Sequence, residues 1–433
     1  MPYEIIVDIE GSHHTIEILN GPVKTIYSVV RTYHHTPFKL TYQGCIIEGT
    51  TSNYDKKILQ VVPLVSPQLS RYKRSSLWNL CSITGQCLAV GKPIDSLNSF
   101  FDHASFRYAK SYQEVSSGQN GTISSYTYNR EGYLSYAILK KAHGITSDSL
   151  VYEYLVGVQF INKMIRKYPC FIYTYGLYDN LQLQKEVNFE KACTQSGKMS
   201  ILIQSIHHGV TLETYLNDRY FLEYELLPVL YIIYHTLSEL SKVYTHYDLH
   251  GENIILFELT TPIEYVYPNV TFRSKYIPKL IDYGRCFFSD KVSSSDVYKS
   301  VCKSCEKCGY DSGFSLLDPE SFMEISSQRK NESHDLRLLD MIKNKYTLDQ
   351  IYPPALLIPL LEKVVYGEGL EGDDKIYGTR ENLTVNDRHI YNVTGARIAL
   401  ETCMQKFRSP HQVIGGKMKI SPGQNIIYQS IEG

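Results

Sequence analysis

A cluster of polar residues follows the longest apolar stretch of the chain. The segment YTHYDLHGENIILFEL, residues 244–259, holds two histidines, an aspartate, a glutamate and an asparagine within eight positions. It follows the apolar, helix-like FLEYELLPVLYIIYHTLSELSKVY and contains the strand-like NIILF. A segment that served only packing would not need this cluster. The segment is therefore either a loop that carries chemistry or an ordinary polar turn.

The spacing of these residues favours chemistry. His246, Asp248 and Asn253 form the pattern H-x-D-x-x-x-x-N, and the apolar run PKLIDYGRCFF then brings Asp282 into a Tyr-Gly turn. Phosphoryl transfer needs an Asp that orients and deprotonates the attacking hydroxyl, and an Asn and a second Asp that hold Mg²⁺ against the phosphates. Oxygen ligands of this kind suit Mg²⁺. The alternative is two unrelated polar turns, because the first pattern alone is a weak signal.

Three features upstream could serve the same chemistry. Gly118 and Gly121 lie in a turn between two strand-like segments, where backbone N–H groups can cover phosphates. The strand YAILKKA offers Lys140 or Lys141 to neutralise phosphate charge, and the uncertain strand register leaves both open. Glu153, in the apolar body of the following helix, is the natural partner for that lysine. Taken singly, these features would be a hairpin turn, a solvated strand end and an exposed helix residue.

The periodicity of the chain predicts an α+β fold. Residues 1–70 alternate polar and apolar, and the chain from about residue 108 reads as strands around one helical segment. Beyond residue 330 the patterns are helical. This order predicts a mixed lobe followed by a helical lobe. The predicted divisions are a β-rich N-terminal region at 1–75, a leader and mixed lobe at 76–200, and a helical lobe with a C-terminal helical extension at 201–433.

Composition argues against several classes of protein. Lys+Arg total 44 and Asp+Glu total 45, so the chain lacks the basic field that nucleic acid attracts. The N-terminal MPYEIIVDIEGSHHTIEIL carries acids and no long apolar core, so we expect no signal peptide. The apolar LLPVLYIIYH is about half a membrane span. Ten scattered cysteines indicate reduced thiols, and we expect a cytoplasmic protein that binds neither nucleic acid nor membrane.

Taken in order, these motifs resemble those of the protein kinase-like fold. The resemblance covers about residue 110 to 345 and consists of a Gly-rich loop, an AILK strand lysine, a helix glutamate, the HYDLHGEN loop and the IDYG turn. It implies a bilobal fold, with a β-rich N-lobe and a helical C-lobe, preceded by the small β-rich N-terminal region. It also implies an ATP- and Mg²⁺-dependent phosphotransferase, in the first place a Ser/Thr protein kinase.

The resemblance implies a role for each matched residue. Asp248 would be the catalytic base, and His246 would assist it by supporting the catalytic loop. Asn253 and Asp282 would bind Mg²⁺, and Asp335 would tie the backbone of the catalytic loop. The positions implied for ATP are Gly118, Gly121, Lys140 for the phosphates, Glu153 to orient that lysine, and the backbone around Gln204 and Ile206 for adenine.

The chain departs from the common kinase pattern in ways that leave other functions open. His250 stands where most Ser/Thr kinases have Lys. A histidine at this position is more like the pattern of aminoglycoside and choline kinases, which allows a small-molecule kinase. Asp248 and Asp282 are 34 residues apart, which predicts an inserted hairpin over residues 258–278. The Gly-rich pattern lacks its first glycine and no A-P-E-like segment follows DYG, which allows a catalytically inactive kinase-like scaffold.

The wider sequence is similar to kinase-like proteins of large DNA viruses. The segments GQCLAVGKPIDSLNSFFDHASFRYAKSY and LVYEYLVGVQFINKMIRKYPCFIYTYGLY carry this resemblance and extend it upstream to about residue 75. It implies a viral protein located in the host cytoplasm or the virion. A protein substrate would be its partner, together with virion or host proteins.

One cysteine cluster stands apart from these motifs. Cys302, Cys305 and Cys308 are spaced C-x-x-C-x-x-C, whereas a structural zinc site needs four ligands. Cys286 and His334 are the candidates for a fourth ligand. We favour free thiols over a metal site.

Overall fold

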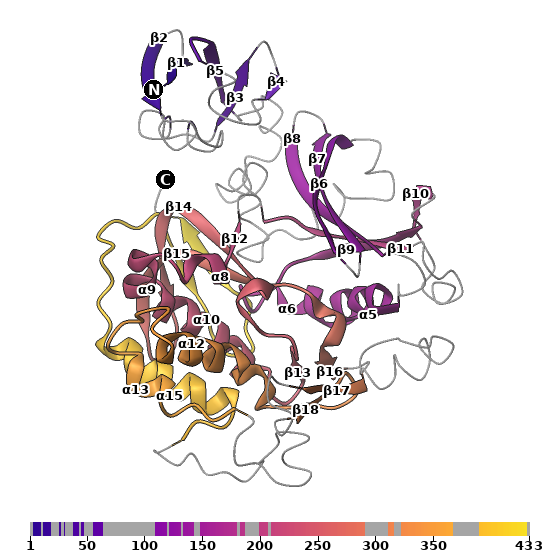
Figure 1. Ribbon diagram of the computed structural model, residues 1–433, viewed down its shortest axis with the longest axis vertical. Coiled ribbons are helices and arrows are strands. Elements are labelled where there is room, and N and C mark those ends of the chain that lie inside the picture. Colours follow the sequence, from indigo (N-terminus) through magenta and orange to yellow (C-terminus); the bar gives the residue numbers. More distant parts are fainter. Residues whose placement is uncertain are drawn as a thin grey trace. The chain divides into compact units, whose positions relative to one another are not determined.

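The computed structural model is an α+β structure with several sheets and helices (Figure 1), which confirms the predicted class. It describes residues 3–9, 12–18, 26, 30, 38–42, 45–46, 55–63, 109–118, 121–130, 133–142, 148–179, 182–186, 199–206, 209–290, 311–315, 322–366 and 389–430. The chain divides into two compact units, Met1–Thr84 with Glu131–Tyr133, and Gly85–Arg130 with Leu134–Gly433. The candidate site lies in the second unit.

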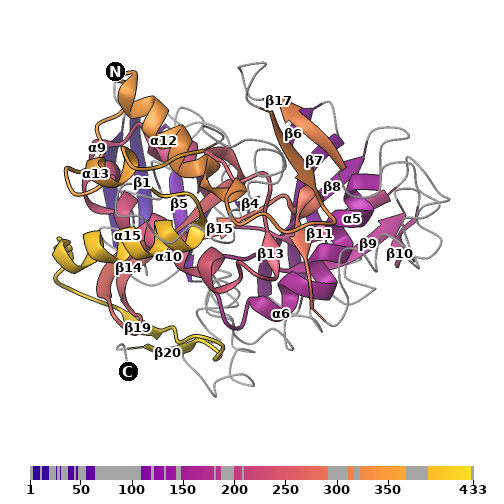
Figure 2. The same ribbon diagram turned by 90° about the horizontal axis from the view of Figure 1, so that it is seen from below.

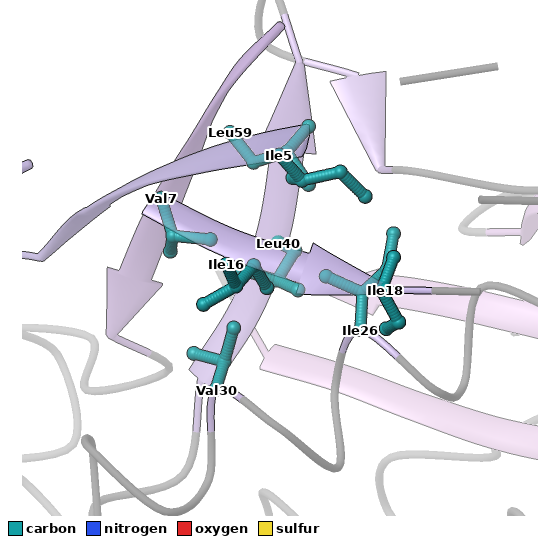
Figure 3. Close-up of a cluster of buried hydrophobic side chains, with 8 residues drawn as sticks. All are labelled: Ile5, Val7, Ile16, Ile18, Ile26, Val30, Leu40 and Leu59. Atoms are coloured by element: carbon teal, nitrogen blue, oxygen red, sulfur yellow. The ribbon is translucent and has the colours of Figure 1, made fainter. Parts of the chain in front are cut away.

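The first unit contains a sheet built on alternating apolar residues. Among its described residues, five strands pair in the order β2-β1-β5-β3-β4: β1 (Tyr3–Ile9), β2 (Ser12–Ile18), β3 (Phe38–Tyr42), β4 (Cys45–Ile46) and β5 (Ile58–Pro63). β1 pairs antiparallel with β2 and parallel with β5. The apolar side chains converge on one buried cluster (Figure 3), made of Ile5, Val7, Ile16, Ile18, Ile26, Val30, Leu40 and Leu59. The alternation in the sequence therefore marks the face that these strands bury.

The first part of the larger unit, in chain order, contains a second sheet. In the part of the chain that the structure describes, six strands pair in the order β10-β9-β11-β8-β7-β6. They are β6 (Ala109–Gly118), β7 (Gly121–Arg130), β8 (Tyr133–Ala142), β9 (Thr174–Asp179), β10 (Gln182–Glu186) and β11 (Met199–Gln204). β8 and β11 are antiparallel neighbours, so the lysine strand lies beside the strand that ends at Gln204.

A helical segment lies against this sheet (Figure 1). α5 (Asp148–Val156) continues through a π-helical turn, η4 (Gly157–Ile161), into α6 (Asn162–Met164), and α5 contacts β9 and β11. A Cβ added to Gly157 would lie 2.1 Å from Thr174 Oγ1, so only glycine fits there. The Asn162 amide donates to the Thr174 carbonyl (2.8 Å) and accepts from the Thr174 N–H (2.9 Å). Gly157 and Asn162 thus hold the helix close to β9.

A long hairpin occupies the chain between the two acidic motifs. β14 (Ile254–Val266) and β15 (Thr271–Leu280) are antiparallel, and Ile254 pairs with Leu280 at their inner end. β19 (Gly416–Lys419) joins β14 in parallel, β20 (Ile427–Ser430) pairs with β19, and β12 (Val210–Thr211) pairs with the inner part of β14. The hairpin predicted over residues 258–278 corresponds to the outer part of β14 and β15, which the C-terminal strands widen into a sheet.

The central helix of the larger unit is buried on all sides. α10 (Leu226–Glu239) buries every side chain from Leu226 to Leu237 and packs against β15 and α15 (Val393–Lys406) (Figure 2). A helix that is apolar all round belongs in a core. The shorter helices are α8 (Leu212–Tyr215), α9 (Arg219–Tyr224), α12 (Arg337–Thr347) and α13 (Ile358–Leu361). None of the helices that the structure describes is long and apolar enough to cross a bilayer.

A buried lysine ties the hairpin to the segment that follows α6. Lys279 on β15 is fully buried, and its Nζ donates to the carbonyls of Pro169 and Phe171 (3.1 Å for Phe171). Burial lowers the pKa of Lys279 to about 7, which the neighbouring Cys170 thiol opposes. A neutral amine has two N–H donors, and these two carbonyls can accept both. The folded protein therefore favours the neutral form of Lys279.

We expect the stability of the wild type to rise with pH relative to that of a Lys279→Met variant. Between pH 7 and the ordinary lysine pKa the unfolded state binds a proton that the folded state does not, so the free energy of unfolding increases with pH. The steepest slope of the difference is about 1.4 kcal/mol per pH unit. Urea unfolding at pH 7 and pH 10 measures it. Lys275→Met, at a partly exposed position of the same strand, is the control, and an equal pH response in both variants would contradict the assignment.

Candidate active site

The inner end of the β14–β15 hairpin brings the two predicted metal ligands together. Asn253 ends the short helix η5 (Gly251–Asn253) just before β14, and Asp282 follows β15. The Ile254–Leu280 pairing closes the hairpin, and the Ile281 N–H donates to the Asn253 carbonyl (3.0 Å). Strand pairing therefore holds residues from the two motifs side by side although the hairpin separates them in sequence.

A buried carboxylate anchors the loop that carries Asp248. Asp335, in η8 (His334–Leu336), accepts hydrogen bonds from the backbone N–H groups of His246 (2.8 Å) and Tyr247 (3.0 Å). Burial raises the pKa of Asp335 to about 7, against the effect of these two N–H donors. Tyr247 has a φ of 64°, a conformation that costs an L residue of this size roughly 1–2 kcal/mol. The two hydrogen bonds to Asp335 fix this strained backbone.

The buried His246 side chain positions the loop that carries Asp248. Its side chain is fully buried, and its Nε2 lies 3.1 Å from the Ile281 carbonyl, which can only accept. Its Nδ1 accepts the N–H of Asp248 (3.3 Å). Burial lowers the pKa of His246 to about 4 although the carboxylates of Asp248 and Asp282 oppose this. His246 is therefore neutral with its proton on Nε2, and it joins the loop before Asp248 to the residue before Asp282.

Two arginines and a histidine surround the Asp248 carboxylate. Its Oδ1 accepts from Arg337 Nη1 (2.7 Å), lies 3.0 Å from Arg285 Nη1 and lies 3.7 Å from His250 Nε2. Arg285 ends η6 (Tyr283–Arg285), and Arg337 is the first residue of α12. The Asn253 amide nitrogen donates to the Asp248 backbone carbonyl (2.9 Å). The Asp248 carboxylate is thus held by several nitrogens, and the Asn253 side chain is held by the Asp248 backbone.

Lys140 is the lysine of β8 that reaches the acidic residues. Its Nζ donates to Glu153 Oε1 (2.7 Å) and lies 3.7 Å from Asp282 Oδ1. Neighbouring residues of a strand point to opposite faces, which separates Lys140 from Lys141. Burial by itself would lower the pKa of Lys140, but the carboxylates of Asp282 and Glu153 outweigh it and raise the pKa. Of the two lysines that the sequence left open, Lys140 is therefore the one that lies against Glu153 and Asp282.

The two carboxylates beside Lys140 differ in environment. The Lys140 ammonium lowers the pKa of Asp282, and His246, Arg285 and the Gly284 N–H act in the same direction. The Asp282 side chain is 47% exposed, whereas that of Glu153 is only 3% exposed. Burial raises the pKa of Glu153, which Lys140 opposes. Asp282 is therefore the accessible, ionised carboxylate of the pair, and Glu153 is the buried partner that holds the lysine.

Two residues of the candidate site, Tyr247 and Asp282, have strained backbone conformations. Asp282 has φ 67° and ψ 74°, in the left-handed region. Among the described non-glycine residues only four have positive φ, and Tyr247 and Asp282 are two of them. The aromatic residue after Asp282 holds the turn, because Tyr283 OH donates to the Leu280 carbonyl (2.8 Å) and accepts the Ile172 N–H (3.0 Å). Strained residues persist where the surroundings fix them, as they do at functional sites.

Three of the other predicted nucleotide residues lie on the six-stranded sheet, and Ile206 follows its strand β11. Gly118 and Gly121 face each other at the ends of β6 and β7, and the two residues between them fall outside the described residues. Gln204 ends β11, and its backbone N–H donates to the Tyr173 carbonyl (2.8 Å) while its Oε1 accepts the Tyr173 N–H (3.1 Å). The Ile206 carbonyl accepts the Gly209 N–H (2.8 Å). Within the described ranges, no hydrogen bond or ion pair joins any of these four residues to Lys140 or Asp282.

Metal ligands at this site would be oxygen atoms. Within the described ranges, no group of three or more His, Cys, Asp or Glu side chains could hold a metal ion. Asn253 and Asp282 nevertheless offer an amide oxygen and an ionised carboxylate, which suit a cation that takes its other ligands from phosphates and water. The Cys302, Cys305 and Cys308 cluster lies outside the described residues. Cys286 is buried against Tyr244 and the His246 carbonyl, and His334 packs against Tyr247.

The sequence did not single out Arg285 and Arg337 as site residues. Arg285 belongs to the same IDYGR segment as Asp282, and Arg337 follows Asp335 by two positions. These positions, beside Asp282 and Asp335, were the signal in the sequence that could have indicated the two arginines. Arg337 is 89 residues from Asp248 in sequence, so only the fold reveals their contact.

Comparisons with known proteins add no relative. A scan against models of protein families finds no match for the chain. A search of curated proteins finds no match either. The geometry and charges of these residues are therefore the basis for assigning a function.

Proposed function

We propose that the chain is an ATP- and Mg²⁺-dependent phosphotransferase, a Ser/Thr protein kinase with Asp248 as its catalytic base. One observation carries the proposal: Lys140 contacts both Glu153 (2.7 Å) and Asp282 (3.7 Å), and the hairpin end joins Asp282 to the loop of Asn253 and Asp248. A cation for phosphates, oxygen donors for a metal and a carboxylate base thus come from separate segments to one region.

The architecture supports a bilobal, kinase-like arrangement. The six-stranded sheet with α5 would form the N-lobe, and α8 to α15 with the β14–β15 sheet would form the C-lobe. The strand lysine and helix glutamate would then lie on the N-lobe, and the base and metal ligands on the C-lobe. In this arrangement adenine would lie beside the chain around Gln204 and Ile206, and Gly118 and Gly121 would flank the phosphate loop.

Asn253 and Asp282 would hold the magnesium ion. Lys140 keeps the pKa of Asp282 low, so its carboxylate is ionised at neutral pH. The amide nitrogen of Asn253 donates to the Asp248 carbonyl, which leaves the amide oxygen as the atom available to a cation. Magnesium bound there would neutralise charge on the nucleotide phosphates.

The remaining residues of the site would carry out the transfer step. Lys140 would hold the α- and β-phosphates of the nucleotide. Asp248 would take the proton of the acceptor hydroxyl as the hydroxyl oxygen bonds to the γ-phosphorus. The bond between that phosphorus and the β-phosphate oxygen breaks, and ADP leaves. His246 is neutral and buried, so it would position the loop without exchanging protons.

A kinase-like scaffold without turnover is the second candidate. The contacts of Arg285 (3.0 Å) and Arg337 (2.7 Å) with Asp248 favour it, because they occupy one oxygen of the base. His250, 3.7 Å from the same oxygen, keeps a small-molecule kinase as the enzymatic alternative. Virion or host proteins are the proposed partners of either form.

A phosphotransfer assay tests the proposal. Purified protein with γ-labelled ATP and Mg²⁺ is expected to label itself or a generic protein substrate, and an excess of EDTA should reduce the rate to background because the phosphates lose their cation. Choline and aminoglycosides serve as alternative acceptors. Transfer that persists in EDTA would contradict the proposal. ATP binding without transfer to any of these acceptors would favour the scaffold.

A further inference from the structure

Cys286 joins three segments of the candidate site. It follows the η6 turn after Asp282, it is fully buried, and it directly precedes β16 (Phe287–Phe288). β16 pairs with β13 (Tyr244–Thr245), the strand that leads into the loop of Asp248. Both the side chain and the backbone carbonyl of Cys286 make hydrogen bonds to elements distant in sequence. The residue therefore lies where the turn of Asp282, the loop of Asp248 and helix α5 meet.

The Cys286 thiol holds the peptide group between His246 and Tyr247. Its Sγ lies 3.4 Å from the His246 carbonyl, which can only accept, and 3.2 Å from the Tyr244 hydroxyl. Burial raises the pKa of the thiol well above its ordinary value, although the Tyr244 hydroxyl opposes this. The S–H group is therefore present at neutral pH and donates to the His246 carbonyl, and the Tyr244 hydroxyl donates to the sulfur.

The same peptide group is held on its other side by Asp335. The Asp335 carboxylate accepts the Tyr247 N–H (3.0 Å), so the carbonyl and the N–H of one peptide plane each have a fixed partner. The orientation of this plane sets the φ of Tyr247, which is strained at 64°. Asp248 is the next residue, so the plane also sets the direction of the proposed base. Removal of the thiol releases one side of this plane.

The backbone carbonyl of Cys286 ties the same position to helix α5. It accepts a hydrogen bond from the Tyr152 hydroxyl (2.8 Å), and Tyr152 is fully buried and precedes Glu153. Glu153 binds Lys140, whose Nζ lies 3.7 Å from Asp282. A closed path of contacts thus runs from the lysine through the helix to Cys286 and back along the chain to Asp282.

We propose that Cys286 is a positioning residue for phosphoryl transfer, which holds the loop of Asp248, the turn of Asp282 and the helix of Glu153 at fixed positions relative to one another. The proposal rests on the phosphotransferase function proposed above. Cys286 touches neither substrate nor cofactor in this role, and its thiol undergoes no chemistry. It acts through the His246 carbonyl and the Tyr152 hydroxyl.

A role in packing alone makes a different prediction. If the thiol only fills space, Cys286→Ala lowers the stability of the fold and leaves kcat unchanged at a temperature where the variant is folded. If the thiol positions the loop, kcat falls, and Cys286→Ser, which keeps a donor for the His246 carbonyl, retains more of the wild-type value. Cys170→Ala is the matched control. The Cys170 thiol is equally buried and lies 3.5 Å from the Ile232 carbonyl and 3.3 Å from the Thr236 hydroxyl.

Transfer from γ-labelled ATP to a protein substrate measures the kinetic effect. At a temperature where thermal unfolding shows every variant to be folded, we expect Cys286→Ala to lower kcat by about tenfold or more, because small misplacements of a catalytic group are costly. The KM for the protein substrate should change little, and Tyr152→Phe should lower kcat in the same direction. A kcat of Cys286→Ala equal to that of Cys170→Ala, or an equal loss in Cys286→Ala and Cys286→Ser, overturns the proposal.

Hydrogen exchange separates this inference from the proposed function, because it requires no turnover. The full chain and its variants are exchanged without nucleotide, and mass spectrometry follows residues 148–156, 244–249 and 282–288. We expect Cys286→Ala to speed exchange in all three segments and Cys170→Ala to leave them near the wild type. Faster exchange confined to residues 282–288 overturns the proposal. An absence of transfer by the wild type would contradict the proposed function alone, and exchange would still decide whether Cys286 joins the three segments.

Discussion

Asp248→Asn is expected to lower kcat for phosphoryl transfer by about 10²- to 10⁴-fold, the range that general base catalysis contributes. The asparagine amide retains the shape of the side chain but cannot accept the hydroxyl proton. Lys140, Asn253 and Asp282 remain in place, so ATP should still bind. The initial rate of transfer from γ-labelled ATP, measured beside ATP affinity, shows whether the loss lies in the transfer step.

Two checks accompany this variant. The substitution leaves Arg285 and Arg337 without the negative charge between them, so thermal unfolding must show that the variant is folded at the assay temperature. Asp349→Asn is the matched control, because Asp349 is exposed and its positive φ suits asparagine. Transfer by Asp248→Asn at the wild-type rate would mean that Asp248 is not the base or that a contaminating enzyme supplies the signal.

Lys140→Met is expected to lower kcat/KM for ATP by about 10²-fold or more, because the negative charge of the ATP phosphates loses the lysine cation that would stabilise it. The substitution also leaves Glu153 buried without its partner. Breaking a buried ion pair in this way costs about 3–5 kcal/mol of stability. Steady-state kinetics with varied ATP and urea unfolding measure the two effects separately.

A neighbouring lysine and a double variant sharpen this prediction. Lys141→Met changes the adjacent residue of β8, which pairs with Ser200 where Lys140 pairs with Ile201, and it should leave ATP kinetics near the wild type. Lys140→Met with Glu153→Gln removes the buried charge as well, so it should recover stability without recovering activity. An equal loss of kcat/KM for ATP in Lys141→Met and Lys140→Met would contradict the prediction, because it would show that the loss comes from a disturbed strand and not from the missing Lys140 ammonium group.

The local parts of the fold could be predicted from the sequence because they depend on neighbouring residues. Alternation in residues 3–18 indicated strands, and it reflects the burial of Ile5, Val7, Ile16 and Ile18. The parallel pairing of β1 with β5 could not be predicted, since that contact joins segments about 50 residues apart. The close approach of Thr174 to Gly157 could not be predicted either, because it joins a helical turn to a residue of β9.

The candidate site also has a part that the sequence could predict and a part that it could not. The spacing of the two acidic motifs, taken with the upstream glycines, lysine and glutamate, indicated Asp248, Asn253 and Asp282 as candidates. The alternation of β8 meant that only one of two lysines could face Glu153. It could not settle which one, because a shift of one residue exchanges the two faces of a strand. The arginine contacts on Asp248 arise from side chains of separate elements, and no local pattern encodes them.

The affinity for ATP as a function of Mg²⁺ concentration tests the central claim most directly. The claim is that Asn253 and Asp282 hold a magnesium–nucleotide complex next to Lys140. Isothermal titration calorimetry should find that millimolar Mg²⁺ strengthens ATP binding to the wild type by about tenfold or more, and that Asp282→Asn loses this Mg²⁺-dependent part. ATP affinity that is the same with and without Mg²⁺, or an Asp282→Asn variant that keeps the full Mg²⁺ dependence, would contradict the account.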